Sequence, residues 1–199
     1  MTVRKTVAFS KDSANLFFHI LTECNLNCRH CYINPAQHGK SRVPLDSINA
    51  WLDVFSDNSA ATNLVFLGGE PTLHPNLAEA VEYARSSSFN SITIDTNGFL
   101  FHDILDKVGP EAVDFFSFSL DGATRKTNDA IRGQGSYDAC INGIQKTVSA
   151  GFATSLIYTV SRANIDELVR MPALLSNLGV DRFFIQVIGL RGKASRSDA

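Results

Sequence analysis

The feature that most constrains the fold is an alternation of strand-like and helix-like segments along the chain. Short runs rich in β-branched and aromatic residues are each followed by a turn and then by a segment whose apolar residues have helical spacing. The strand-like runs are 16–22, 63–68, 91–96, 114–120, 153–160 and 182–189. The helix-like segments are 45–57, 76–88, 101–108, 136–150 and 165–178. This pattern predicts repeated βαβ units and therefore a parallel sheet with helices outside it.

The number of strands decides between a closed and an open arrangement. Six strands are too few to close an eight-stranded barrel, which usually takes about 250 residues. We therefore predict the α/β class, with an open, parallel-stranded partial (β/α)6 barrel forming a single domain over residues 16–199. Residues 1–15 are expected to be a lead-in. No helix follows the last predicted strand, so either the barrel ends early or the chain is part of a longer protein.

Composition and charge narrow the functional classes. The 199 residues include 18 basic and 20 acidic side chains, giving a net charge of −2. Binding of nucleic acid through bulk positive charge is therefore not expected. The apolar runs fall far short of the roughly 18 residues that a membrane helix needs, and the first residues lack the apolar stretch of a secretory signal. We expect a cytoplasmic protein with no membrane and no nucleic-acid partner.

The strongest chemical signal is a group of three cysteines, Cys24, Cys28 and Cys31, in the loop after the first predicted strand. Parallel α/β sheets carry their chemistry at the carboxyl ends of strands, so this loop suits a site. A loop can wrap three thiolates around a [4Fe–4S] cluster and leave one iron open to a small molecule. The spacing also allows a structural zinc site, with His30, His38 or a distant residue as fourth ligand, or reduced core cysteines.

The run ECNLNCRHCY, followed by GGEP, TNG, SLDG and IRG at or after successive strand ends, resembles the radical S-adenosylmethionine (SAM) enzymes. The signature of that family is CxxxCxΦC, and His30 occupies the usually aromatic position Φ, which places it beside the cofactors. The resemblance covers nearly the whole chain. It implies a [4Fe–4S] cluster on Cys24, Cys28 and Cys31, with SAM chelating the fourth iron. It also implies an external electron donor such as flavodoxin or ferredoxin, and a 5′-deoxyadenosyl radical that abstracts hydrogen from substrate.

The ends of the second and third predicted strands carry further candidates. Glycines such as Gly68 and Gly69 let the backbone approach a ligand closely, and the Glu70 carboxylate can accept hydrogen bonds from an ammonium group. The resemblance implies that this motif binds the SAM amino group. By the same resemblance Thr96 and Asn97 face SAM. Taken alone, both Gly-Gly and Asn-Gly are also common turn sequences.

The fourth and sixth predicted strands complete the candidate site. Hydroxyl and carboxylate groups suit ribose hydroxyls, and the fork of arginine donors suits a carboxylate. The resemblance implies that Ser119 and Arg132 reach the methionyl carboxylate and that Asp121 lies near the ribose. The alternative to a SAM-binding role is that this segment is only the capped start of a helix and that Arg132 is exposed to solvent. Gln186 and Ile188 are expected to contact adenine by the same resemblance.

Several other residues are expected to be structural. Cys140 has helical spacing with apolar neighbours and is predicted to lie in the core. Asn164 is expected to cap the helix that follows it, and a role near the nucleoside is the alternative. The remaining histidines have no visible partner in the sequence, and we expect no site role for them: His19, His38, His74 and His102.

The SLDG and IRG pattern resembles the radical SAM branch that modifies peptides or builds cofactors. A peptide is therefore the predicted substrate, and biosynthesis of a small-molecule cofactor or natural product is the alternative. The lysine-bearing motifs expected of a GTP-cyclising enzyme are not evident, and after Cys31 only Cys140 remains to hold any auxiliary cluster. A different class is a non-catalytic zinc or iron–sulfur domain, which would leave as unrelated surface residues Glu70, Ser119, Asp121 and Arg132.

Overall fold

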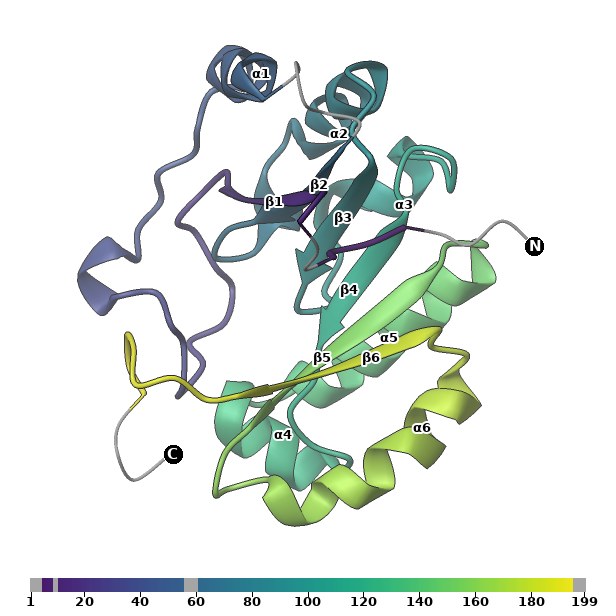
Figure 1. The fold of residues 1–199 in the computed structure, drawn as a ribbon. Coiled ribbons are helices and arrows are strands. Elements are labelled where there is room, and N and C mark those ends of the chain that lie inside the picture. The colour runs from purple at the N-terminus through teal and green to yellow at the C-terminus, as the bar shows by residue number, and fades with distance from the viewer. Residues whose placement is uncertain (1–4, 9–10, 56–60, 195–199) are drawn as a thin grey trace.

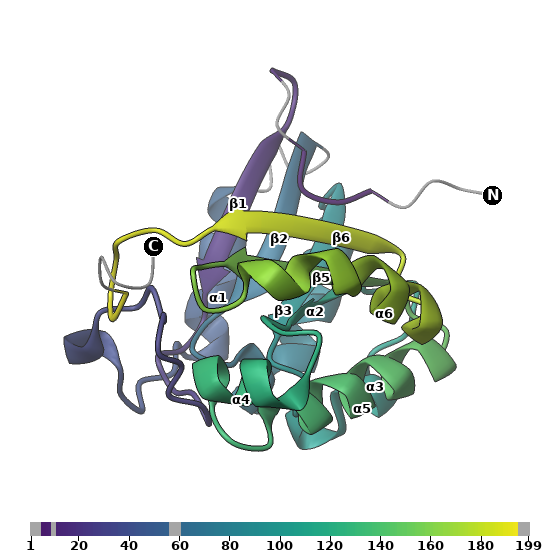
Figure 2. The ribbon, with the colours of Figure 1, turned by 90° about the horizontal axis from the view of Figure 1, so that it is seen from below.

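Six strands form one open sheet whose order follows the chain, β1-β2-β3-β4-β5-β6. The computed structural model describes residues 5–8, 11–55 and 61–194. All neighbouring strands are parallel, and the sheet curves into a partial barrel (Figures 1 and 2). The strands are β1 (Ala14–His19), β2 (Thr62–Leu67), β3 (Ser91–Thr96), β4 (Phe115–Ser119), β5 (Thr154–Val160) and β6 (Arg182–Val187). The predicted open (β/α)6 architecture is confirmed.

Helices follow the strands and lie outside the sheet (Figure 2). The α-helices are α1 (Leu45–Val54), α2 (Leu77–Ser86), α3 (Ile104–Lys107), α4 (Arg125–Arg132), α5 (Ser136–Ser149) and α6 (Met171–Leu178). The 3-10 turns are η1 (Pro35–Gln37), η3 (Pro71–Leu73), η4 (Phe101–Asp103) and η5 (Ile165–Arg170). None of the helices in the described ranges is long and apolar enough to cross a membrane.

Helix α4 lies between the predicted strand 114–120 and the predicted helix 136–150, where the sequence pattern indicated no helix. Its buried side chains are Asn128, Ile131 and Arg132, so it presents no apolar stripe to the core. The only apolar residues of this helix are Ala130 and Ile131, which are adjacent, so a search for apolar residues at helical spacing finds none there. Its start is capped instead, because the Thr124 hydroxyl accepts a hydrogen bond from the backbone N–H of Thr127.

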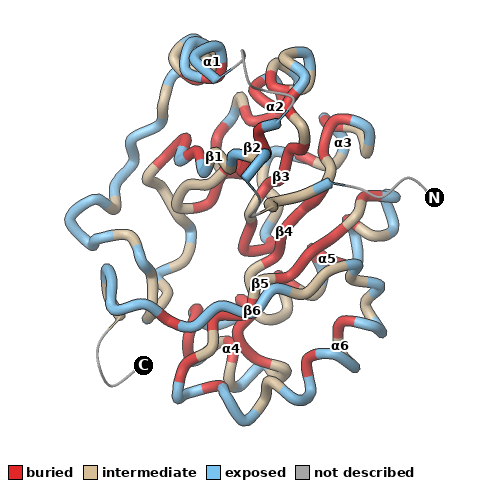
Figure 3. The backbone as a smooth tube through the Cα atoms, viewed as in Figure 1, coloured by how far each residue is buried: buried red, intermediate tan, exposed pale blue. Residues whose placement is uncertain are grey.

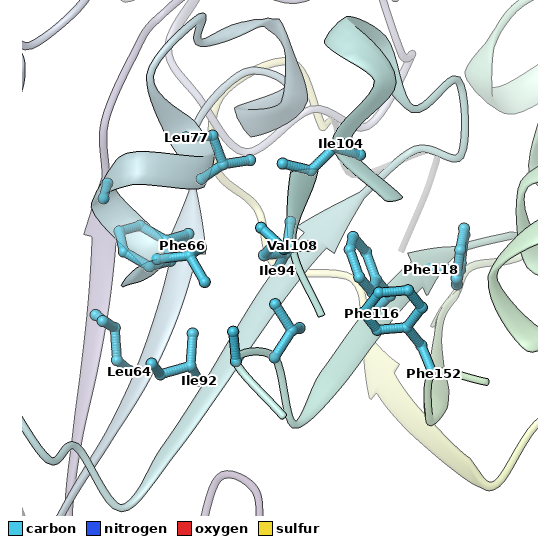
Figure 4. Close-up of a cluster of buried hydrophobic side chains, with 14 of the residues drawn as sticks. Leu64, Phe66, Leu77, Ile92, Ile94, Ile104, Val108, Phe116, Phe118 and Phe152 are labelled. Atoms are coloured by element: carbon cyan, nitrogen blue, oxygen red, sulfur yellow. The ribbon is translucent and has the colours of Figure 1, made fainter. Parts of the chain in front are cut away.

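The hydrophobic core lies between the outer face of the sheet and the helices. In β4, Phe116 and Phe118 are fully buried on that side, whereas Ser117 and Ser119 alternate with them. Figure 4 shows the two phenylalanines in line with side chains of the neighbouring strands and helices, and Figure 3 shows burial concentrated in the central strands. The polar positions of the strands are thereby left for the inside of the barrel.

Asn164 lies at the start of η5, but its side chain does not cap that turn. Its Oδ1 accepts hydrogen bonds from the backbone N–H and the hydroxyl of Ser161, and its Nδ2 donates to the carbonyl oxygens of Asp121 and Thr159. The expectation of a helix cap is therefore wrong. The residue joins the carboxyl ends of β4 and β5, which fixes the backbone beside the site described next.

Candidate functional site

A cavity of about 670 Å³ lies at the carboxyl ends of the strands. Parallel strands all end at this edge, so the loops that follow them meet there. Nearly all the residues predicted for the site line the cavity: Cys24, Cys28, His30, Cys31, Gly68, Gly69, Glu70, Thr96, Asn97, Ser119, Arg132, Gln186 and Ile188. The topology thus brings together motifs that are more than a hundred residues apart in the sequence.

The loop after β1 carries the three cysteines to the wall of the cavity. Their thiols are free and partly buried. The Cys24 sulfur accepts a hydrogen bond from the Leu26 backbone N–H at 3.4 Å, and the Asn97 amide nitrogen lies 4.0 Å from the same sulfur. The Cys31 sulfur lies 3.3 Å from His38 Nε2. Donors of this kind stabilise thiolate sulfur, which is the form that binds metal.

The chemistry of these donors fits an iron–sulfur cluster. Burial raises the pKa of the Cys24 thiol to about 12, with Glu70 and the other two thiols adding to the effect, and burial also raises the pKa of Cys28. Ionising the thiols therefore calls for positive charge nearby, which a bound metal centre supplies. Within the described ranges no three His, Cys, Asp or Glu side chains are arranged as ligands of one metal ion. A cluster has a different requirement, because each cysteine binds a separate iron.

Gly68 and Gly69 allow the cysteine loop to approach the end of β2. A Cβ on Gly69 would lie 2.2 Å from the carbonyl oxygen of Glu23 and 2.8 Å from the Cβ of Cys24. A Cβ on Gly68 would lie 2.4 Å from a methyl carbon of Leu21. The two glycines were predicted to admit a ligand. In the structure, the space beside the two glycines is filled by the backbone and side chains of the loop that follows β1. This contact sets the position of Cys24.

Glu70 is the centre of a buried hydrogen-bond network and is 1% exposed. Its Oε1 accepts from the Thr72 backbone N–H at 3.2 Å, the Thr72 hydroxyl at 2.6 Å and the Thr96 hydroxyl at 2.8 Å. Its Oε2 accepts from the Asn97 backbone N–H at 2.7 Å. Burial raises the pKa of Glu70, and these donors oppose that shift. Since a carboxylate oxygen has two lone pairs, Oε2 keeps one acceptor position for a ligand.

Asp121 occupies a different position from the one predicted. It is fully buried and is not among the described residues that line the cavity. Its Oδ1 accepts a hydrogen bond from the Thr159 backbone N–H at 2.7 Å, and its Oδ2 lies 2.6 Å from both His30 Nε2 and Arg132 Nε. Burial alone would raise the pKa of Asp121, but the Arg132 guanidinium and His30 hold it below its usual range.

This arrangement makes Asp121 an anchor for two cavity residues. Asp121 raises the pKa of Arg132 against the opposing effect of burial, so the guanidinium stays charged on the cavity wall. The backbone of Arg132 also holds the cysteine loop, because its carbonyl oxygen lies 3.7 Å from the Cys28 sulfur. The Nε of Arg132 and Nδ1 of His30 are buried without a well-aligned hydrogen-bond partner.

The remaining predicted residues lie on the strands at the other side of the cavity. Ser119 ends β4 on the inner face, and Ile188 continues the pairing of β6 by donating its N–H to the Val160 carbonyl at 3.0 Å. Gln186 is exposed on β6, and its Nε2 donates to the Thr159 hydroxyl at 2.8 Å. Ser119 and Gln186 give this wall hydrogen-bonding groups, and Ile188 gives it an apolar surface.

The structure adds cavity residues that the sequence did not indicate. His19 and His38 were expected to have no site role, yet both line the cavity together with Tyr32 and Asp95. A signal was present for Asp95, because it lies two residues before Asn97 in a strand and so shares its face. By contrast, His74 is a buried residue whose Nε2 meets the Val43 carbonyl oxygen at 2.9 Å and whose Nδ1 accepts the Asn76 N–H.

Comparison with known proteins identifies the family. The model of the Radical SAM superfamily matches residues 19–175. The chain belongs to this superfamily. Membership implies SAM and an iron–sulfur cluster as cofactors, in agreement with the three cysteines and the polar strand ends on one cavity.

Cys140, which was predicted to be a core residue, is indeed buried in the hydrophobic core.

Individual radical SAM relatives align with most of this chain. Fe-coproporphyrin III synthase of Methanosarcina barkeri is 28% identical over 192 residues, which cover 94% of this chain and 47% of the relative. Mycofactocin maturase MftC of Mycobacterium tuberculosis is 30% identical over 173 residues, covering 82% of this chain and 42% of the relative. A probable GTP 3′,8-cyclase of Saccharolobus islandicus is 26% identical over 178 residues, covering 89% and 58%.

Solved structures share the fold. Streptococcus suis SuiB bound to its precursor peptide SuiA superposes with a TM-score of 0.78 at 17% identity, covering 89% of this chain and 40% of SuiB. The chain spans about half the length of the curated relatives it matches. The names of these proteins cover a porphyrin synthase, a GTP cyclase and a maturase, so they do not single out one substrate class.

Proposed function

We propose that this chain is the core of a radical SAM enzyme that binds a [4Fe–4S] cluster through Cys24, Cys28 and Cys31 and binds SAM beside it. When both are bound, the cluster delivers an electron that cleaves SAM to methionine and a 5′-deoxyadenosyl radical, the species that takes hydrogen from substrate. The electron comes from an external donor such as flavodoxin or ferredoxin. The observation that carries this proposal is the meeting of three partly buried thiols and the polar strand ends on one cavity.

The protein's own residues bind and orient SAM in this proposal. The free acceptor position on Glu70 Oε2 takes the ammonium group, while Thr96 and Asn97 hold the carboxylate of Glu70 in place through their hydrogen bonds. Arg132, kept charged by Asp121, takes the methionyl carboxylate.

The opposite wall of the cavity takes the nucleoside. In this proposal Ser119 binds the methionyl or ribose end, and Gln186 and Ile188, which line the same cavity, contact the adenine ring. Asp121 is assigned to positioning Arg132 and His30, because its oxygens already face those two side chains and Thr159.

A peptide is the substrate that we propose. Support comes from the 30% identity to mycofactocin maturase MftC and from the shared fold of SuiB, which was solved with a precursor peptide. A small molecule is the second candidate, because Fe-coproporphyrin III synthase and a probable GTP 3′,8-cyclase are similar over most of this chain.

The proposed chemistry is tested by anaerobic reconstitution. Iron and sulfide are added to the protein, followed by dithionite and SAM, and 5′-deoxyadenosine is sought by mass-resolved chromatography. The wild-type protein should form it, and Cys28→Ala should lose both the cluster and the product. Cys140→Ala is the matched control, because Cys140 is buried in the core and does not line the cavity.

Two outcomes would overturn this proposal. Full SAM cleavage by Cys28→Ala would remove the cysteine from the cluster. Binding of zinc in place of iron and sulfide, with no 5′-deoxyadenosine formed, would leave a non-catalytic metal domain. Iron, sulfide and zinc analysis of the same sample distinguishes these results.

A further inference from the structure

A second group of polar side chains lies deeper in the barrel than the strand ends assigned to SAM. In the parallel register His19 pairs with Leu67, and Asp95 pairs with Ser117, which pairs with Ser155. Asp95 lies in β3 two residues before Asn97, which follows the strand, and so about 7 Å from Asn97 toward the interior of the barrel. Of these residues, His19, Leu67 and Asp95 line the same cavity as the cysteines.

Asp95 is a carboxyl group on the cavity wall that forms no ion pair with a lysine or arginine of the described ranges. The Ser117 hydroxyl donates a hydrogen bond to it. Burial raises the pKa of Asp95 to about 7, and the nearby carboxyl of Glu70 adds to the rise. A carboxylate offers about four acceptor positions, so most of the hydrogen-bonding capacity of Asp95 is available to a ligand.

Aromatic residues also line this cavity. Tyr32 follows the last cysteine of the loop, and its ring packs edge-on against His19 with 5.9 Å between centroids. Its hydroxyl lies 3.4 Å from His19 Nε2. Tyr32 and Asp95 both line this cavity. Phe17, on β1, is 52% exposed and also lines the cavity.

We propose that Asp95 binds a cationic amine of the substrate, with Tyr32 and Phe17 flanking that amine. The inference rests on the proposed function and names the substrate class of the same cavity. A carboxylate with no protein cation gains most from a ligand that brings one, since the pair is then neutral when water is excluded. Aromatic faces attract the same cations. Asp95 lies further into the barrel than the residues assigned to SAM. The part of the substrate that is remote from the reacting atom would lie there.

Alkyl probes test this assignment without any need to know the substrate. Reconstituted protein saturated with SAM is titrated anaerobically with n-butylammonium and with n-butanol, and binding is followed by saturation-transfer NMR of the probes. SAM fills the position at Glu70, so any preference that remains reports a separate site. Wild-type protein should bind the ammonium probe at least about tenfold more tightly than the alcohol, as expected of a charge-assisted hydrogen bond.

Asp95→Asn should reduce that preference to less than about twofold, because the amide keeps the shape of the side chain but not its charge. Asp106→Asn is the matched control, since Asp106 is exposed on α3 and does not line the cavity. It should retain the full preference. Circular dichroism and iron content verify that each variant is folded and loaded.

Either of two results would overturn the inference. One is a wild-type protein that binds the two probes equally, a result that needs no variant. The other is a folded Asp95→Asn protein that still prefers the ammonium probe. Failure of the proposed function is seen separately, as the absence of 5′-deoxyadenosine from wild-type protein without any probe.

Discussion

Replacing Gly143 by alanine is expected to destabilise the protein, although alanine is the better helix former. Gly143 lies within α5, where that substitution alone would stabilise by about 1 kcal/mol. A Cβ at this position would, however, lie 2.3 Å from the carbonyl oxygen of Gly98 and 3.1 Å from its Cα. The obstacle is backbone, so no side-chain rotation relieves it.

The opposing turn cannot move away easily either. Gly98 has φ +95°, and a Cβ there would lie 2.5 Å from the Cα of Cys140, so helix and turn are in direct backbone contact. Separating them by about an ångström costs roughly 2–3 kcal/mol, in the upper part of the usual range for overpacking, and this exceeds the gain in helix propensity. We expect a net loss of about 1–2 kcal/mol, which corresponds to a fall in Tm of about 2–8 °C for a chain of this size.

The measurement is urea or thermal unfolding by far-ultraviolet circular dichroism, with Asn142→Ala as the control. Asn142 is the exposed neighbour in the same helix, so its replacement tests helix propensity alone and should stabilise by about 0.5 kcal/mol. A weaker affinity for SAM should accompany the Gly143 effect, because the turn carries Asn97, whose N–H bonds Glu70. If Gly143→Ala is as stable as Asn142→Ala, the close contact between the backbones at Gly143 and Gly98 is refuted.

Two further predictions concern buried charge and pH. Arg132→Ala removes the cation beside the fully buried Asp121 and should cost about 3–5 kcal/mol of stability, together with weaker SAM binding measured by calorimetry. Glu167 accepts hydrogen bonds from the hydroxyls of Thr124 and Thr127. Burial would raise the pKa of Glu167, but these bonds hold it below the ordinary value of 4.5. Its stabilising contribution is therefore present above that pH and is lost as pH falls through the lower folded-state value. Glu167→Gln should flatten the acid limb of the stability curve of the cluster-free protein.

Matched variants separate these effects from general surface mutation. Arg125→Ala, at the exposed start of the same helix α4, should change stability by less than about 1 kcal/mol and leave SAM binding unaltered. SAM affinity unchanged in Arg132→Ala would remove that residue from the site. Asp166→Asn, beside Glu167 and exposed, should keep the wild-type pH profile. If the acid limb of Glu167→Gln is identical to that of the wild-type protein, the hydrogen bonds of Glu167 with Thr124 and Thr127 contribute nothing to the pH dependence of stability.

The sequence determined the architecture and the location of the site. Alternation of apolar and polar residues along strands such as β4 assigns one face to the helices and the other to the barrel interior, and this local pattern needs no tertiary information. The order of the strand-end motifs then places Cys24, Glu70 and Arg132 at one edge, because parallel strands end together. Helix α4 escaped prediction because it buries Asn128 and Arg132 rather than an apolar stripe.

Only the tertiary structure decided which of these residues touch. The strand register and the close approach of the backbones turn Asp121 away from the cavity toward Arg132, and they give Glu70 hydrogen-bond donors from both η3 and β3. They also bring Asp95 and His19, which lie on different strands, to one wall. The physical reason is that a side chain's partners depend on the positions of several chain segments to within a hydrogen-bond length, whereas its face on a strand depends only on its neighbours in sequence.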